Sequence, residues 1–282
     1  MFCGIDRSMD FIRSCAYRED EEIDAGALAL AFVWDDHQTL KPAVLERYVR
    51  HFSSIAEQVR MRYRALLDAG SADDASVRLA ALKYAIYEDQ GYRHDEQGYE
   101  MIESADMIRV INRGAGCRAA LALLYMDAAR RCGWEIEGMN VASFFLCRLS
   151  HGTERLIFDP GRGCAVLQAH DLRMLVKSRL GENAELCSEY LSGLDAKQSI
   201  IYLCNYLKHR RIEMGEYGQA LLMIQRMQAL VPDEYRLLLD AGVLYARVGD
   251  SDNARESLQS YIEKAPNAYD RYEAQLLLDE ID

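Results

Sequence analysis

The sequence repeats itself after about residue 195 with a period of 34 residues. Three pairs of residues of the same type are one period apart: Gly215 and Gly249, Ala220 and Ala254, and Pro232 and Pro266. A glycine permits a tight turn, a small residue lets two helices approach closely, and a proline ends a helix. A helix–turn–helix unit of this length cannot bury its apolar face alone, so the period predicts stacked helical units.

The repeat resembles the tetratricopeptide repeat, and Gly242 and Tyr245 supply the small and the aromatic residue typical of its first helix. This resemblance implies two repeats and a capping helix over residues 196–282, with a protein or peptide as the partner. We expect the partner-binding face to carry five side chains: Tyr202, Asn205, His209, Arg236 and Leu239. The alternative is that this face packs against the preceding part of the chain.

Composition predicts a folded protein and argues against several partners. Half of the 282 residues are hydrophobic, 28% are charged and the net charge is −12. A nucleic-acid-binding surface needs a basic stripe, and no long basic run occurs. No apolar stretch of about 18 residues is present, so no membrane partner is expected.

The eight cysteines lack the spacing of zinc ligands, and no metal or organic cofactor is implied. Scattered single cysteines favour a reducing, cytoplasmic location.

Before the repeats, most segments have helical periodicity. Residues 1–24 end in an acidic run and are interpreted as a solvated N-terminal extension that leads into the first helix. Helices are expected from Ala25, again through residues 45–59, and again after the cap-rich stretch 71–74. Residues 87–99 are interpreted as a loop. Strand patterns occur only over residues 138–149 and 155–158, which predict a hairpin with its turn at residues 150–153.

Cys117 has the placement of a nucleophile. It follows Gly114-Ala115-Gly116 and precedes an uninterrupted helical run that ends near Gly133. The N–H groups and dipole of a helix N-terminus lower the pKa of a thiol there, and the thiolate is the reactive form. A base and an orienting carboxylate must complete such a site, and Asp159, before Pro160, is suited to the second role. The competing interpretation makes Cys117 a small buried residue at a tight helix entry.

Gly116-Cys117-Arg118 entering a helix is similar to the nucleophile signature of transglutaminase-like proteins. The order of motifs resembles the bacterial family described as regulators of sirC expression, in which a transglutaminase-like core precedes tetratricopeptide repeats. The segments that carry the resemblance are residues 123–133, 138–140, 145–148 and 158–160. The resemblance implies a mostly α (α+β) fold, with a helical, papain-like core and a small antiparallel hairpin or sheet over residues 25–195.

One departure from the family decides the functional expectation. Where the family reads Gly-His-Phe-Leu-Val-Arg, this chain has Ser143-Phe144-Phe145-Leu146-Cys147-Arg148, so Phe144 takes the place of the histidine. Phenylalanine cannot accept a proton. His94, in the expected loop before Cys117, is the one weak substitute, because His151 lies roughly 20 Å further along the strand.

The sequence therefore predicts a pseudoenzyme. We expect a regulatory or scaffold protein with a degenerate transglutaminase-like core, in which Cys117 and Asp159 are vestigial, and with repeats that bind a protein. The alternative is a cysteine hydrolase or acyltransferase that uses Cys117 with a displaced histidine base. A fast-alkylating thiol at Cys117 would distinguish the two.

Overall fold

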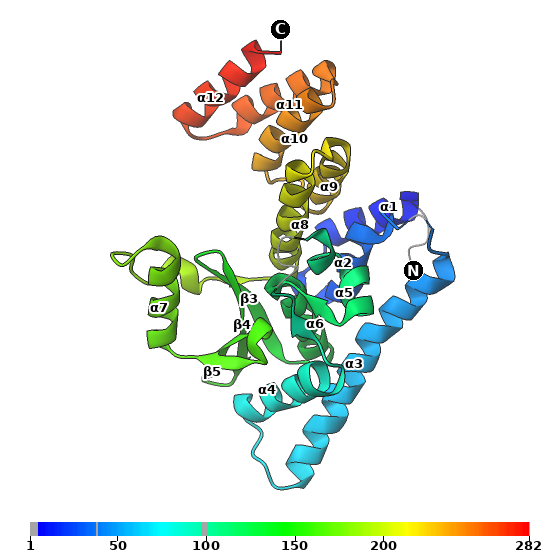
Figure 1. Cartoon of the computed structure of the whole chain (residues 1–282), viewed down its shortest axis with the longest axis vertical. Coiled ribbons are helices and arrows are strands. Elements are labelled where there is room, and N and C mark those ends of the chain that lie inside the picture. Colours follow the sequence, from blue (N-terminus) through cyan, green and yellow to red (C-terminus); the bar gives the residue numbers. More distant parts are fainter. Residues whose placement is uncertain (1–4, 38, 97–100, 282) are drawn as a thin grey trace. The chain divides into compact units, whose positions relative to one another are not determined.

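The computed structural model describes residues 5–37, 39–96 and 101–281, and contacts divide the chain into two compact units. The first unit is a single segment, residues 19–203, and the second joins residues 5–18 to residues 204–281. Helices predominate in both units, and a small five-stranded antiparallel sheet lies in the first (Figure 1). The expectation of a mostly α (α+β) fold is confirmed.

The helices of the first unit are α2 (Ala25–Trp34), α3 (Pro42–Asp68), α4 (Ala75–Lys83), α5 (Met107–Arg113), α6 (Arg118–Arg131) and α7 (Ala169–Leu180). Short helical turns lie between them: η1 (Asp20–Glu22), η2 (Tyr84–Asp89), η3 (Ile102–Ser104), η4 (Pro160–Arg162) and η5 (Ser188–Leu191). The expected cap of α4 is present, since the Asp74 carboxylate accepts a hydrogen bond from the N–H of Val77 at 2.8 Å. α6 is buried along most of its length and contacts both α3 and the sheet.

The sheet has the strand order β6 (Ala165–Leu167), β5 (Glu154–Asp159), β4 (Phe144–His151), β3 (Glu135–Val141) and β7 (Gly193–Leu194). Alternate side chains point to opposite faces of a strand. On one face the ring of Phe158 packs edge-on against Tyr125 of α6, with 5.6 Å between ring centres. On the other face Leu146 packs with Leu172 of α7. Figure 1 shows the sheet between these two helices.

The prediction of a single strand over residues 138–149 is wrong, because β3 and β4 already form a hairpin within that range. Its turn is Ala142-Ser143, with φ of 49° and 65°. Two successive positive φ values are the geometry of the type I′ turn, for which Asn-Gly and Asp-Gly are the usual sequences. Ala-Ser carries no such signal. The second turn, before β5, lies where it was expected, and Gly152 provides its φ of 57°.

The second unit contains the repeats. α8 (Ala196–Glu213) continues into it, followed by α9 (Tyr217–Leu230), α10 (Arg236–Arg247), α11 (Ser251–Lys264) and α12 (Ala268–Asp279). Gly215 and Gly249 end α8 and α10 with φ of 75° and 82°, a region that other residues enter only at a cost. Ala220 and Ala254 are fully buried. Helix pairs with matching glycines and buried alanines therefore recur at the predicted 34-residue period.

The interpretation of residues 1–24 as a solvated extension needs correction. Residues 5–16 form the helix α1, which packs against α9 within the second unit. From residue 8 onward, where burial is described, its buried side chains are Ser8, Ile12 and Cys15, spaced four and three residues apart on one face. The sequence carried a signal for this helix that was not used, because Ile5, Met9, Ile12 and Ala16 recur at steps of four and three residues.

Candidate functional site

Cys117 is the N-cap residue of α6, and the backbone before it explains that position. α5 ends at Gly114 with φ of 64°, and Ala115–Gly116 then forms the short strand β2. A Cβ atom on Gly116 would lie 2.9 Å from a methyl of Val110, so only glycine fits there. This close approach lets the Cys117 N–H donate to the carbonyl of Ser104 at 2.6 Å. The chain therefore enters α6 at the residue expected from the sequence.

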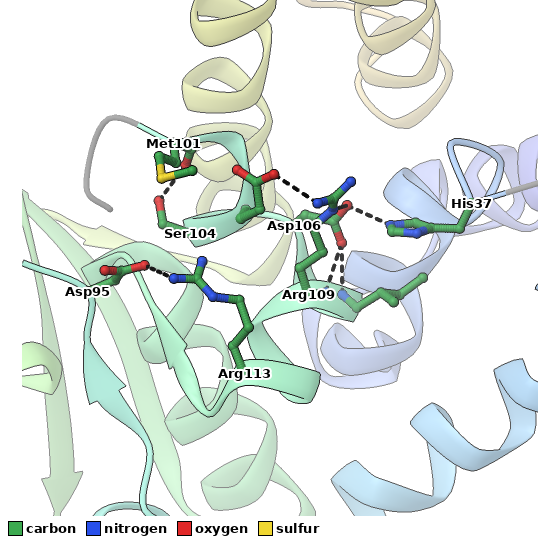
Figure 2. Close-up of polar contacts among 9 residues, drawn as sticks. His37, Asp95, Met101, Ser104, Asp106, Arg109 and Arg113 are labelled. Carbon is green, nitrogen blue, oxygen red and sulfur yellow. Dashed lines mark hydrogen bonds and ion pairs between the residues drawn. The ribbon is translucent and has the colours of Figure 1, made fainter. Parts of the chain in front are cut away.

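The segment that receives Cys117 is itself held by ion pairs (Figure 2). Asp106 caps α5 by accepting from the N–H groups of Ile108 and Arg109, at 2.9 and 3.2 Å, and its other oxygen lies 2.6 Å from His37 Nε2. Arg113, in the last turn of α5, donates to Asp95 at 2.6 Å. These contacts fix both ends of α5 and so hold Ser104, next to α5, where the Cys117 N–H reaches it.

The Cys117 thiol is buried and its pKa is unfavourable for a nucleophile. Burial raises the pKa to about 11, whereas the N–H groups of Ala120 and Ala119 and the charge of Arg118 act in the opposite direction. The helix N-terminus therefore favours the thiolate, but desolvation is the larger effect. A pKa near 11 leaves roughly one thiol in 10,000 ionised at neutral pH.

Asp159 ends β5, where the sequence placed it, and its carboxylate is fully engaged. Its side chain is 2% exposed. Oδ1 accepts a hydrogen bond from the N–H of Gly161 at 2.7 Å, and Arg118 Nε lies 3.2 Å from Oδ1 and 3.4 Å from Oδ2. The carboxylate that would orient a histidine in a triad is here the counter-ion of an arginine.

Phe144, at the position of the family's histidine, is the first residue of β4. Its ring packs beside the cluster of Met139, Leu146 and Val176 between the sheet and α7. The guanidinium carbon of Arg118 lies 4.1 Å from the ring centre, a cation–π distance. The ring therefore supports the arginine that occupies the Asp159 carboxylate.

His94 is not a solvated loop residue, and the interpretation of residues 87–99 as a loop needs correction. η2 extends to Asp89, and Arg93–His94 forms the strand β1, which pairs in parallel with β2; residues 97–99 lie outside the described residues. His94 Nδ1 lies 3.2 Å from the carbonyl of Gly116. A two-residue strand is too short to leave a periodic pattern in the sequence.

Both ring nitrogens of His94 have partners. Arg118 Nη1 lies 2.8 Å from Nε2, and because arginine only donates, Nε2 is the acceptor and Nδ1 carries the proton. Burial, and then the charge of Arg118, lowers the pKa of His94, although the carbonyl of Gly116 acts in the opposite direction. His94 is therefore held neutral, and its basic nitrogen faces a guanidinium.

Arg118 connects the cluster, and it is the residue whose role the sequence reasoning missed. It contacts Asp159, His94 and the ring of Phe144, and a Cβ on Gly161 would lie 2.9 Å from its Cγ. A signal was present, because a cation in the first turn of a helix opposes the helix dipole and needs a compensating anion. We name Arg118, Asp159, His94 and Phe144 the Arg118 cluster.

The five expected partner-binding residues lie on two helices, Tyr202, Asn205 and His209 on α8 and Arg236 and Leu239 on α10. Tyr202 belongs to the first unit, where its ring packs on Phe145 at 4.8 Å and its hydroxyl donates to the carbonyl of Ser143. The other four lie in the second unit: Asn205 accepts from Lys208, His209 is exposed, Arg236 lies over the ring of Tyr235, and Leu239 packs beside Tyr261.

Two further properties of the described residues bear on function. None of their helices is both long and apolar enough to cross a membrane. Within the same described ranges, no group of three or more His, Cys, Asp or Glu side chains is arranged to hold a metal ion.

Comparisons with known proteins identify both parts of the chain. A family model described as the transglutaminase-like superfamily matches residues 46–205, and one described as the tetratricopeptide repeat matches residues 207–279. These matches confirm the combination expected from the sequence. No solved structure matches.

Several similar curated proteins are bacterial. A UPF0162 protein of Xylella fastidiosa (strain 9a5c) is 22% identical over 263 residues, covering 91% of this chain and 89% of the relative. A UPF0162 protein of Vibrio cholerae is 25% identical over 254 residues, or 88% and 90% of the two chains. Protein SirB1 of Salmonella typhimurium is 22% identical over 197 residues, covering 70% of this chain and 72% of that protein.

Proposed function

This chain belongs to the transglutaminase-like superfamily, and from that premise we propose that it is a non-catalytic regulatory or scaffold protein whose tetratricopeptide repeats bind a protein partner. The observation that carries the proposal is the Arg118 cluster. Cysteine-dependent acyl transfer needs a thiolate, a base that takes and returns a proton, and a group that orients the base. Each of these requirements can be compared with the residues present.

The orienting group is unavailable for its catalytic role. Asp159 is buried, and Arg118 and the N–H of Gly161 already use its oxygens. A histidine introduced nearby would have to displace a charge-assisted ion pair to reach it. The Asp159 carboxylate therefore serves to stabilise the fold.

The base is missing from its expected position. Phe144 offers no proton acceptor, and the acceptor nitrogen of His94 is bonded to Arg118, which is permanently charged. Protonating His94 would place an imidazolium against a guanidinium, so proton transfer from Cys117 to His94 is unfavourable. With the thiol pKa near 11, the nucleophile also stays protonated.

Thiol reactivity tests the proposal. Cys187 is exposed and provides an internal standard, whereas Cys117 is buried. We expect iodoacetamide at neutral pH to alkylate Cys187 at least tenfold faster than Cys117, measured by mass spectrometry of the two peptides in one sample. Faster alkylation of Cys117 than of Cys187 would contradict the proposal. So would a burst of product from an activated ester or amide that disappears in Cys117→Ala.

The second candidate is a cysteine hydrolase or acyltransferase that uses Cys117 with His94 as a displaced base. It is favoured by the N–H groups of Ala119 and Ala120 beside the thiol, and by the bond from His94 to the carbonyl of Gly116. In this function, an acid group of the substrate pairs with Arg118 and releases His94 Nε2. That function requires Cys117 alkylation to accelerate by more than tenfold when a carboxylate-bearing amide is added, a change that the non-catalytic function does not predict.

A further inference from the structure

The helix α12 has one packed face and one open face. Ala274 and Leu278 are buried, Ala274 in a cluster with Tyr261 and Ala265 of the preceding repeat. On the opposite side Tyr269 is 64% exposed, Tyr272 62% and Leu276 46%. These three positions lie within about 60° of arc on a helix of 3.6 residues per turn. Figure 1 shows α12 beside α11 at the end of the repeats. We call Tyr269, Tyr272 and Leu276 the α12 stripe.

The repeat itself indicates what such a stripe receives. One period of 34 residues before the stripe lie Tyr235, the N-cap residue of α10, and Leu238 and Gly242 within α10. Tyr235 and Leu238 pack in the cluster that includes Tyr261 of α11, and a Cβ on Gly242 would lie 2.7 Å from Leu258 of α11. In the preceding repeat these positions therefore contact the following helix. In α12 the equivalent positions are open, so the geometry is that of a surface which accepts a helix.

Exposed apolar side chains at these positions are unfavourable in water and gain free energy when a second surface covers them. Two tyrosines and a leucine in one stripe form an apolar patch, and patches of this kind on otherwise polar surfaces indicate interaction sites. Tyrosines are also enriched among the residues that contribute most to protein interfaces.

The charged residues beside the stripe indicate the charge that a complementary partner would carry. Glu273, Asp279 and Glu280 are exposed and flank the stripe. Arg271, the one basic residue of α12, donates to the carbonyls of Ala265 and Pro266. Asp279 and Glu280 also end the helix, where the dipole disfavours anions. An antiparallel second copy of α12 would bring these carboxylates together, whereas a basic helix would neutralise them.

We propose that the α12 stripe and its flanking carboxylates form a docking surface for an amphipathic helix of a partner protein, one with an apolar face bordered by Lys and Arg. This rests on the proposed function, because it assigns a surface and a partner chemistry to repeats that bind a protein. The partner helix occupies the place that the second helix of a further repeat would take.

The direct test uses two synthetic helical peptides and the full chain. Both peptides are about 18 residues long with Leu at helical spacing. In one the flanks are Lys, and in the other they are Glu. Fluorescence anisotropy measures binding of each. We expect the Lys peptide to bind at least tenfold more tightly than the Glu peptide, and the difference to shrink as salt is raised.

Variants locate the binding surface. Tyr272→Ser with Leu276→Ser should weaken Lys-peptide binding at least tenfold, and Glu273→Gln with Glu280→Gln should reduce its salt dependence. Leu222→Ser is the matched control, because Leu222 is similarly exposed, at 43%, but lies on α9. It should leave binding unchanged. Equal binding to the wild type and the Tyr272/Leu276 variant would overturn the proposal.

Two further readouts separate this proposal from the proposed function. If Arg236→Glu abolishes Lys-peptide binding while the α12 variants do not, the repeats bind a peptide on α10, so the α12 proposal fails and the proposed function stands.

A photo-reactive residue in place of Tyr272 in the full chain should cross-link to the Lys peptide. Sedimentation should show no change of mass in Tyr272→Ser. Loss of a dimer in that variant would identify a second copy as the occupant and overturn the proposal.

Discussion

Groups that are unfavourable in their positions lie both at the N-terminus of α6 and on the outer face of α12. Those at α6 are paired within the fold, whereas those at α12 face solvent. At α6 a cation, Arg118, lies where the helix dipole disfavours it, and Asp159, His94 and the ring of Phe144 satisfy it internally. At α12 the unfavourable groups remain in solvent: three apolar side chains, and carboxylates in the last turn of the helix.

This difference bears on where function lies in the molecule. A cluster whose charges are matched internally gains little from a ligand, and replacing its members chiefly affects stability. A face with exposed apolar area and uncompensated charge gains free energy when a complementary surface covers it. We therefore expect substitutions in the Arg118 cluster to change stability and substitutions in the α12 stripe to change binding.

The largest expected effect comes from removing the cation of the Arg118 cluster. Arg118→Met leaves the Asp159 carboxylate buried without its counter-ion, which should lower the free energy of unfolding of the first unit by about 3–5 kcal/mol. Trp34 and Trp134 are the chain's two tryptophans and both lie in the first unit. Their fluorescence during urea denaturation therefore measures that unit alone.

A double variant is the matched control. Arg118→Met with Asp159→Asn removes both charges, so it should recover a large part of the lost stability. If Arg118→Met has the stability of the wild type, the ion pair between Arg118 and Asp159 does not stabilise the first unit. The contrast between the α6 site and α12 would then be lost.

The next effect tests the two faces of α12 with the same substitution. Leu278 is buried and Leu276 is 46% exposed. Leu278→Ala should destabilise the helix by about 2 kcal/mol, which corresponds to about 30-fold faster hydrogen exchange of its amides. Leu276→Ala should change the exchange by less than about twofold, since surface substitutions usually alter stability by less than 0.5 kcal/mol. Equal effects would mean that the stripe already packs within the fold.

Local signals in the sequence were sufficient for much of this molecule. Gly116 and Gly133 mark the two ends of α6 because each has a backbone requirement that glycine meets. The 34-residue period located the repeats, and a strand before Pro160 located Asp159. These features depend on neighbours in the chain, so periodicity and turn residues reveal them.

The arrangement of the site depends on contacts between distant residues, which leave no such signal. His94 meets Gly116 through a two-residue parallel pairing, and Arg118 meets Asp159 across 41 positions of sequence. The turn at Ala142-Ser143 has a conformation that its residues do not favour, so tertiary packing must supply the stabilisation. The position of Arg118 in the first turn of a helix indicates that it needs an anion, but it does not indicate which one.

A smaller effect is expected when the family's histidine is restored. In Phe144→His, Arg118 still holds Asp159, and its charge disfavours an imidazolium beside it. Alkylation of Cys117 should therefore rise by less than about tenfold, below the 100-fold or more that a working general base provides. Phe144→Tyr keeps the ring and serves as the control. A 100-fold rise in Phe144→His alone would show that the rest of the triad is intact.

The smallest effect is a dependence of stability on pH in the range where histidine titrates, which is expected at the α6 site, whereas α12 contains no histidine. Burial lowers the pKa of His94 in the folded chain, so the unfolded chain binds a proton at higher pH than the folded chain does. The stability of the first unit should therefore fall as pH drops below about 6.5, the ordinary histidine value. His51, whose pKa burial also lowers, contributes in the same direction.

His94→Gln should reduce the slope of stability against pH without removing it, measured by tryptophan fluorescence in urea. At about pH 8 both histidines are neutral in either state, so the variant there reports only the lost hydrogen bonds. A slope that is unchanged in His94→Gln would mean that neither burial nor Arg118 lowers the pKa of His94, and His94 would remain a candidate base.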